Sequence, residues 1–133
     1  MRRSLQPRFA LALAALMLAL AFVPSAAQAR GGGDDARVSA DCARGASGEL
    51  RLKGDDGAIE VELRIDTRRR GARWSVALVH ERRVAWRGSA RTRSDGSLRI
   101  RRTLPDYPGA DEISVRASGP RGVSCLAMAT LEG

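Results

Sequence analysis

Residues 49–65 read ELRLKGDDGAIEVELRI, and this stretch decides the fold class of the chain. Apolar residues alternate with polar ones on both sides of Asp56-Gly57, which is the period of a β-strand with one buried face. A two-residue turn there places Leu52 opposite Val61, so the apolar residues of both strands share a face. The stretch therefore predicts an antiparallel hairpin. Its acidic turn lacks the alternating oxygen ligands of a calcium-binding loop.

The same period continues beyond this hairpin toward the end of the chain. A three-residue loop at 81–83 predicts a second hairpin, and the turn Ser94-Asp95-Gly96, with glycine suited to a left-handed backbone, predicts a third. Gly119-Pro120-Arg121-Gly122 separates the last two strands, the second of which directs Cys125 inward. The expected cross-strand neighbours are Leu78 with Trp86, Thr92 with Leu98, and Ala90 with Ile100.

With a short strand near 37–42, the pattern gives about eight short strands and no convincing helix after the first residues. Turn signals at this spacing are typical of a single antiparallel β-sandwich of the immunoglobulin-like kind. A small eight-stranded β-barrel is the alternative, because alternation alone does not separate two packed sheets from one sheet closed on itself. The sequence therefore predicts an all-β fold with these two architectures open.

The first residues have the three parts of an export signal: arginines, an apolar run at 9–23, and small residues. We expect cleavage after Ala29, at an A-x-A sequence, with cleavage after Ala27 as the alternative. The apolar run is short against the roughly 20 residues of a membrane-spanning helix, so no membrane anchor is expected after cleavage. The predicted organisation is a signal peptide at 1–29, a flexible polar lead at 30–36 and a β-sandwich domain at 37–133.

Cys42 and Cys125 are the two cysteines of the chain. In an exported protein, a pair without C-x-x-C spacing favours a structural disulfide over a metal or redox site. Two free or intermolecular thiols are the alternative. A bridge that closes so long a loop contributes about 4 to 5 kcal/mol to stability on the chain-entropy estimate. We predict this bridge, and a location that is secreted or in the cell envelope.

Three segments resemble small secreted proteins of GC-rich Gram-positive bacteria: the run DDGAIEVE at 55–62, Gly71-Ala72-Arg73-Trp74, and the closing Cys125. The resemblance covers most of the chain after the signal. It implies export and an immunoglobulin-like or fibronectin-like sandwich, and it implies no catalytic residue. The chain departs from true antibody domains in the spacing of tryptophan and cysteine.

His80 is the only histidine, and it ends a strand on the inward phase beside Glu81. The serines nearby in the sequence lie in no recognisable nucleophile motif, so we interpret His80 as structural and half-buried. One histidine and two bonded cysteines leave no metal site of the usual spacing, and no cofactor is expected. The loop carboxylates that a glycosidase-type pair would have to use are Asp66, Asp106 and Asp111.

Arginine supplies most of the basic charge, since Lys and Arg number 23 against 15 acids, for a net charge of +8. The best candidate site is the loop with Arg68, Arg69, Arg70 and Arg73, because guanidinium groups bind phosphate and carboxylate bidentately. The alternative is that these arginines form a solvated surface without a binding role, and that they are frequent because a GC-rich genome favours arginine codons. A second group that can extend the site into a stripe consists of Arg91, Arg93, Arg99, Arg101 and Arg102.

We therefore predict a non-catalytic, monomeric binding domain whose partner is an anionic polymer or another envelope protein. The alternative is a small secreted enzyme or enzyme inhibitor that acts through loop residues such as His80 or Tyr107. Trp74 and Trp86 fall on the apolar phase and are interpreted as core, whereas Tyr107 lies between prolines and is expected to be exposed. Few aromatics lie among the arginines, which does not favour stacking on nucleic-acid bases.

Overall fold

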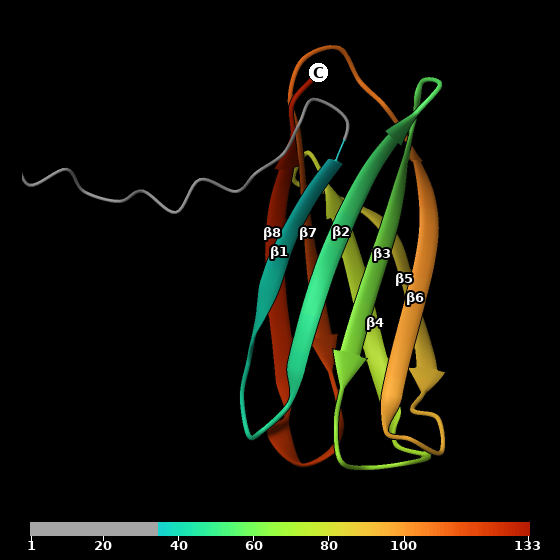
Figure 1. Cartoon of the computed structure of the whole chain (residues 1–133), viewed down its shortest axis with the longest axis vertical. Helices are drawn as coiled ribbons and strands as arrows, with labels where there is room; N and C mark the ends of the chain where they lie inside the picture. Colours follow the sequence, from blue (N-terminus) through green and yellow to red (C-terminus); the bar gives the residue numbers. More distant parts are fainter. Residues whose placement is uncertain (1–34) are drawn as a thin grey trace, which may run out of the picture.

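The computed structural model describes residues 35–133, which form eight antiparallel strands (Figure 1). The strands are β1 (Asp35–Cys42), β2 (Ser47–Asp55), β3 (Ala58–Asp66), β4 (Arg73–His80), β5 (Arg83–Arg91), β6 (Ser97–Pro105), β7 (Asp111–Ser118) and β8 (Ser124–Leu131), with a short 3₁₀ turn η1 (Pro120–Gly122) before β8. The predicted all-β antiparallel fold is confirmed. The expected signal peptide, both of its cleavage positions and residues 30–34 of the lead lie outside the described residues. Within residues 35–133, no helix is long and apolar enough to cross a membrane.

The strands are hydrogen-bonded into one sheet in the order β5-β4-β7-β8-β1-β2-β3-β6. β1 joins the two halves, because its residues 35–40 pair with β2 while Asp41 and Cys42 pair with β8. The sheet curls until its edge strands β5 and β6 approach each other, with no ladder between them (Figure 1). Of the two architectures expected, the structure is nearer to the barrel, since β1 connects halves that a sandwich keeps apart.

The first hairpin has the predicted register, with Leu52 opposite Val61. Asp56 and Gly57 both take a positive φ, 44° and 77°, as a tight two-residue turn between twisted strands requires. The inward residues of all eight strands then form one apolar core inside the curled sheet. Its largest fully buried apolar side chains are those of Trp74, Leu50, Leu52, Ile59, Leu63, Ile65, Leu78 and Ile113.

The predicted third hairpin is wrong. β6 pairs with β3 and not with β5, so Leu98 lies opposite Ile65, where Thr92 was expected. The turn at Gly96 forms, since its amide donates to the carbonyl of Arg93. Thr92, however, exchanges backbone hydrogen bonds with the β3–β4 connection, and this directs the chain across the open end of the sheet. The β5–β6 segment is therefore a crossover between the two sheet edges.

The turn between β4 and β5 is the dipeptide Glu81-Arg82, one residue shorter than expected, because Arg83 pairs with His80. An irregularity after Leu78 shifts the register, so that Leu78 still lies opposite Trp86 as predicted. The predicted loop length was therefore wrong, but the predicted pair of Leu78 and Trp86 is confirmed. A β-bulge in the ladder compensates for the residue by which the turn is shorter.

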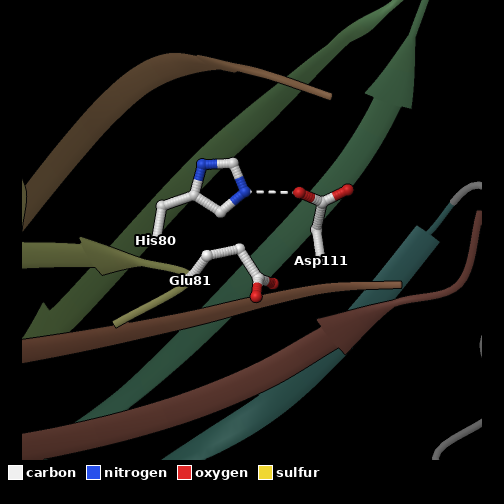
Figure 2. Close-up of side chains that lie close together, drawn as sticks. All are labelled: His80, Glu81 and Asp111. Atoms are coloured by element: carbon white, nitrogen blue, oxygen red, sulfur yellow. Dashed lines mark hydrogen bonds and ion pairs between the residues drawn. The ribbon is translucent and has the colours of Figure 1, made fainter. Parts of the chain in front are cut away.

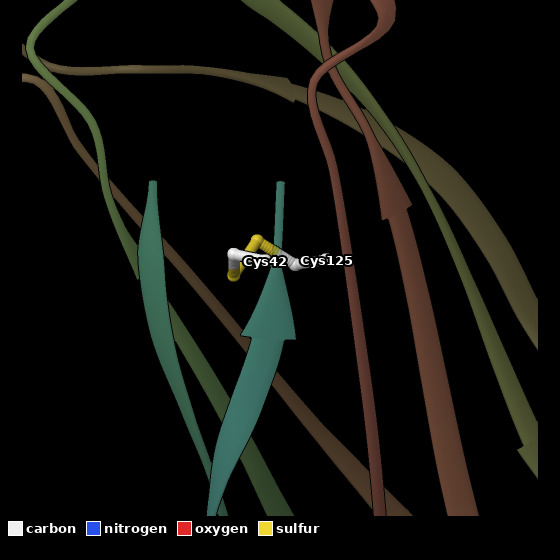
Figure 3. Close-up of a disulfide and its surroundings, with 2 residues drawn as sticks. All are labelled: Cys42 and Cys125. Carbon is white, nitrogen blue, oxygen red and sulfur yellow. A yellow bond between two sulfur atoms is a disulfide. The ribbon is translucent and has the colours of Figure 1, made fainter. Parts of the chain in front are cut away.

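β1 begins at Asp35, two residues before the expected domain start. Ala36 is buried and pairs with Leu52 of β2, so the last two residues of the expected flexible lead belong to the sheet. At the other end of β1, Cys42 is bonded to Cys125 of β8, with an S–S distance of 2.06 Å (Figure 3). The predicted disulfide is confirmed, and such bridges form and persist in oxidising compartments.

Candidate functional site

A cleft of about 450 Å³ opens at the end of the sheet that carries the β1–β2, β3–β4 and β7–β8 connections. Arg68 and Arg69, two of the four arginines predicted to bind an anion, line it together with Arg44 from the β1–β2 connection. Trp74 also lines it, and apolar surface comes from Ala46, Ala72, Pro120 and Val123. The cleft therefore combines guanidinium groups with an apolar wall.

The β3–β4 connection that carries Arg68 and Arg69 is fixed by Thr92, which is 4% exposed. The Thr92 hydroxyl donates to the carbonyl of Arg69 at 2.6 Å and accepts from the amide of Ala72 at 2.8 Å. The amide of Thr67 donates to the carbonyl of Gly96 at 2.9 Å. The arginines thus extend from a loop whose backbone is bonded to the neighbouring crossover, which limits the backbone entropy lost when a ligand binds.

Trp74 is buried, with 1% of its surface exposed, although it lines the cleft. Its indole Nε1–H has no hydrogen-bond partner among residues 35–133. Gly119 approaches the indole so closely that a Cβ there would lie 2.5 Å from Cε2 of Trp74. An unpaired buried N–H costs about 1 to 3 kcal/mol.

The electrostatics at this end favour an anion. Within the described part of the chain, the ion pairs formed by arginine involve other residues than Arg44, Arg68 and Arg69. Asp95 is the one acid in the four connections at this end, residues 43–46, 67–72, 92–96 and 119–123. The arginines in those connections are Arg44, Arg68, Arg69, Arg70, Arg93 and Arg121.

The other predicted arginines do not line this cleft. Arg73 donates from Nη2 to the Ser89 hydroxyl at 3.2 Å, and Arg70 is exposed on the same loop as Arg68. Of the second group, Arg99 and Arg101 pair with Glu62 on the outer face of β3. The candidate site is therefore smaller than the predicted arginine stripe.

Two other members of the second group also have partners within the protein. Arg91 donates from Nη1 to the carbonyl of Gly71 at 3.0 Å. The guanidinium of Arg102 lies 4.1 Å from the ring centroid of Trp86, at the gap between β5 and β6. Trp74 is core as predicted, whereas Trp86, which was also expected in the core, is only partly buried and packs against the core from β5.

Sequence reasoning missed Arg44 and the role of Trp74. Arg44 has a positive φ of 58° in a short connection far from Arg68 in the sequence. Only the pairing of β1 with both β2 and β8 brings that connection beside the β7–β8 turn. Trp74 was correctly assigned to the core, and no sequence pattern shows that one edge of a core side chain borders a cleft.

A second group of polar side chains lies at the opposite end of the sheet (Figure 2). His80, expected to be half-buried, is only 5% exposed, and its Nε2 is hydrogen-bonded to Oδ1 of Asp111, which is 1% exposed. The ring of Tyr107 stacks on the imidazole, with centroids 4.7 Å apart, and remains 49% exposed as expected. The amide of Tyr107 donates to Oδ2 of Asp111 at 3.3 Å.

Two of the three loop acids that the sequence singled out come together here. A hydrogen bond with Asp111, partial loss of water and the charge of Asp111 raise the pKa of Asp106 above its usual value. Asp66 is elsewhere, paired with Arg64 at 3.3 Å. A second cleft, of about 460 Å³, lies beside the disulfide and is lined by Cys42 and Cys125 among others. Neither this cleft nor the arginine-lined one is lined by His80, Asp106 or Asp111.

Comparison of the chain with protein-family models and with curated proteins gave no match. Among solved structures, the chain is similar to chicken MD-1 in its complex with lipid IVa, at 9% sequence identity and a TM-score of 0.30. The similarity covers 72% of this chain and 96% of the MD-1 chain. We draw no conclusion about the site from a likeness at this level.

Proposed function

We propose that the protein is an exported, non-catalytic and monomeric binding domain that holds an anionic group of an envelope or extracellular polymer in the arginine-lined cleft. The observation that carries this proposal is the position of Arg44, Arg68 and Arg69 around a cleft that buried Trp74 also lines. Phosphate and carboxylate oxygens accept hydrogen bonds from guanidinium groups, often two at a time.

The distribution of charge supports the same partner. The connections at the cleft end carry six arginines, Arg44, Arg68, Arg69, Arg70, Arg93 and Arg121, with one acid, Asp95. At the other end, Asp56, Glu81, Asp106 and Glu132 are opposed by Arg82. A molecule with one basic end is attracted to an anionic polymer in a defined orientation, at low ionic strength above all.

Export is supported by the disulfide, by the A-x-A pattern at 27–29 and by the resemblance to small secreted proteins. The apolar part of the cleft, formed by Ala46, Ala72, Pro120 and Val123, favours a ligand whose anionic group adjoins apolar surface. An envelope polymer with phosphate groups and apolar substituents meets both conditions.

The proposal is tested by polyphosphate binding to the purified protein across a salt series. We compare the double variant Arg68→Gln/Arg69→Gln with Arg70→Gln/Arg73→Gln, which removes the same charge from the same loop region outside the cleft. If the cleft binds, only the first pair weakens binding strongly, and the slope of log affinity against log salt falls by about one for each guanidinium that no longer binds a phosphate. Equal weakening by both pairs would indicate diffuse attraction and would contradict a specific site.

The enzyme alternative has one observation in its favour, the meeting of His80 with Asp106 and Asp111. Burial of His80 and Asp111 argues against it, since a general base must reach the proton that it removes. His80→Gln tests it: loss of a hydrolytic activity with the fold intact would favour the enzyme and contradict a purely binding role.

A further inference from the structure

We propose that the end of the sheet opposite the arginine-lined cleft holds one divalent transition-metal ion, with Zn²⁺ as the best match, through His80, Glu81 and Asp111. One ligand atom from each residue lies within 4.8 Å of the other two. Figure 2 shows His80 Nε2 directed at the Asp111 carboxylate, with the Glu81 carboxylate alongside. One imidazole and two carboxylates are a donor set that Zn²⁺ accepts.

The pairing of β4 with β7 and the turn that follows β4 bring the three side chains together. β4 and β7 are paired, with His80 opposite Ile113, so Asp111 is the diagonal neighbour of His80 on the same face. The backbone ladder continues past the strand end, because the amide of Glu81 donates to the carbonyl of Glu112 at 3.0 Å.

Both carboxylates are oriented by backbone donors. The amide of Glu112 donates to Oε1 of Glu81 at 2.6 Å, which leaves Oε2 for an ion. The amide of Tyr107 donates to Oδ2 of Asp111, and its ring stacks on His80. Such outer partners fix ligand geometry in metal sites and are a feature that a chance cluster of surface acids lacks.

The charge of the cluster is unbalanced. Glu81 and Asp111 face a single imidazole, and within residues 35–133 no Arg or Lys forms an ion pair with either of them. The absence is informative in a chain of 23 basic residues. A buried carboxylate such as Asp111 is stable in the ionised form when a cation or several donors face it. A divalent ion supplies that charge.

The identity of the ion follows from the imidazole. Ca²⁺ and Mg²⁺ take oxygen ligands, so they gain nothing from His80, whereas Zn²⁺ binds nitrogen and oxygen together. His80 is the only histidine of the chain, and both cysteines are in the disulfide. In an untagged protein, the imidazole of His80 is therefore the one side chain of this kind whose signals can report Zn²⁺ binding.

The experiment titrates the purified, untagged protein with Zn²⁺ alone and follows heat, thermal midpoint and the NMR signals of the single imidazole. We expect one Zn²⁺ per chain, a raised thermal midpoint and a shift of the His80 resonances. Glu81→Gln removes an exposed ligand and is expected to weaken Zn²⁺ binding about ten-fold or more. Glu132→Gln removes the same charge at the same end, outside the cluster, and is expected to leave binding unchanged.

His80→Gln is expected to abolish binding, and the exposed position of Glu81 keeps the test valid if that buried variant does not fold. Three results would overturn the proposal: no Zn²⁺ bound at millimolar concentration, equal weakening by Glu81→Gln and Glu132→Gln, or displacement of Zn²⁺ by equimolar Ca²⁺. Because the cleft lies at the other end of the sheet, polyphosphate binding by these variants is expected to be unchanged.

Discussion

Cys42 of β1 lies directly opposite Cys125 of β8, and this pair, with Asp41 and Leu126 beside it, makes up the whole ladder between the two strands. The disulfide therefore closes the shortest seam of the sheet, over a sequence separation of 83 residues. Replacing both cysteines by alanine is expected to lower the free energy of unfolding by about 4 to 5 kcal/mol. Urea denaturation measures this loss. Reductant should destabilise the wild type to the same level and leave the variant unaffected, and an unchanged midpoint in the variant would contradict the role assigned to the bridge.

Gly119 and Gly88 each lie against an indole ring, and the comparison separates a fixed ring from a movable one. A Cβ at Gly119 would meet Cε2 of buried Trp74 at 2.5 Å, and a Cβ at Gly88 would meet Cζ2 of partly buried Trp86 at 2.2 Å. Gly119→Ala is expected to cost about 1 to 3 kcal/mol, because the added methyl group forces the buried indole of Trp74 out of its packed position. Gly88→Ala is expected to cost less, since Trp86 can swing outward at the sheet edge. Thermal denaturation of both variants measures the two losses of stability. An equal loss, or a larger loss for Gly88→Ala, would contradict this account.

The sequence predicted those parts of the fold that are local. The pairs Leu52 with Val61 and Leu78 with Trp86 follow from the alternation and the turn between them. The β5–β6 connection was mispredicted for the opposite reason. Its turn residues favour a hairpin, but Thr92 bonds to a loop about twenty residues earlier, and no local pattern indicates that bond.

The candidate site was predicted in the same partial way. Arg68 and Arg69 were found because four arginines in and beside one loop are visible in the sequence. Arg44 and Trp74 were not, since Arg44 comes to the site only when β1 and β8 pair, and since alternation assigns Trp74 to the core alone. His80 and Asp111 were each noted, but alternation does not show which inward residues of different strands share one end of the core.

Asp95 is expected to make the stability of the fold depend on pH, and the sign of this dependence follows from the hydrogen bonds of its carboxylate. Its Oδ1 accepts from the hydroxyl of Ser97 at 2.7 Å and from the amide at 2.9 Å, and these bonds hold the pKa of Asp95 below its usual value. A lowered folded-state pKa means that the carboxylate stabilises the fold above the unfolded pKa of about 3.9, and that this stability is lost as pH falls through the folded value. NMR titration should show the low pKa, with Ser97→Ala returning it toward the ordinary value. An unshifted Asp95 in the wild type would contradict the structure of this turn.

Arg82 occupies a backbone conformation that suits glycine. Glu81 and Arg82 form a two-residue turn with φ values of 49° and 62°, and a side chain in this region is strained. Arg82→Gly is expected to raise the free energy of unfolding by about 0.5 to 1 kcal/mol, the relief of strain less the entropy of glycine in the unfolded chain. Arg83→Gly, in the extended backbone of β5, serves as the control and should destabilise. If both variants lose stability in chemical denaturation, the positive φ at Arg82 is not strained.

Thr92 connects the folding of the crossover to the proposed function. Its hydroxyl is the donor to the Arg69 carbonyl and the acceptor for the Ala72 amide, so it fixes the segment 69–72, which begins at Arg69 and directly follows Arg68. Thr92→Val keeps the shape of the side chain and removes both bonds. The expected cost is about 1 to 3 kcal/mol, because the Ala72 amide loses its partner and the Arg69 carbonyl keeps only the Thr67 hydroxyl at 3.2 Å. The loop then loses its fixed geometry, so polyphosphate affinity should fall even though every arginine is retained.

Thr92→Ser retains the hydroxyl and is expected to keep most of the affinity at some cost in stability. Since both variants have the same net charge as the wild type, a difference between them in binding at constant salt reports the geometry of the loop, and equal binding by all three proteins would show that the arginines act without it.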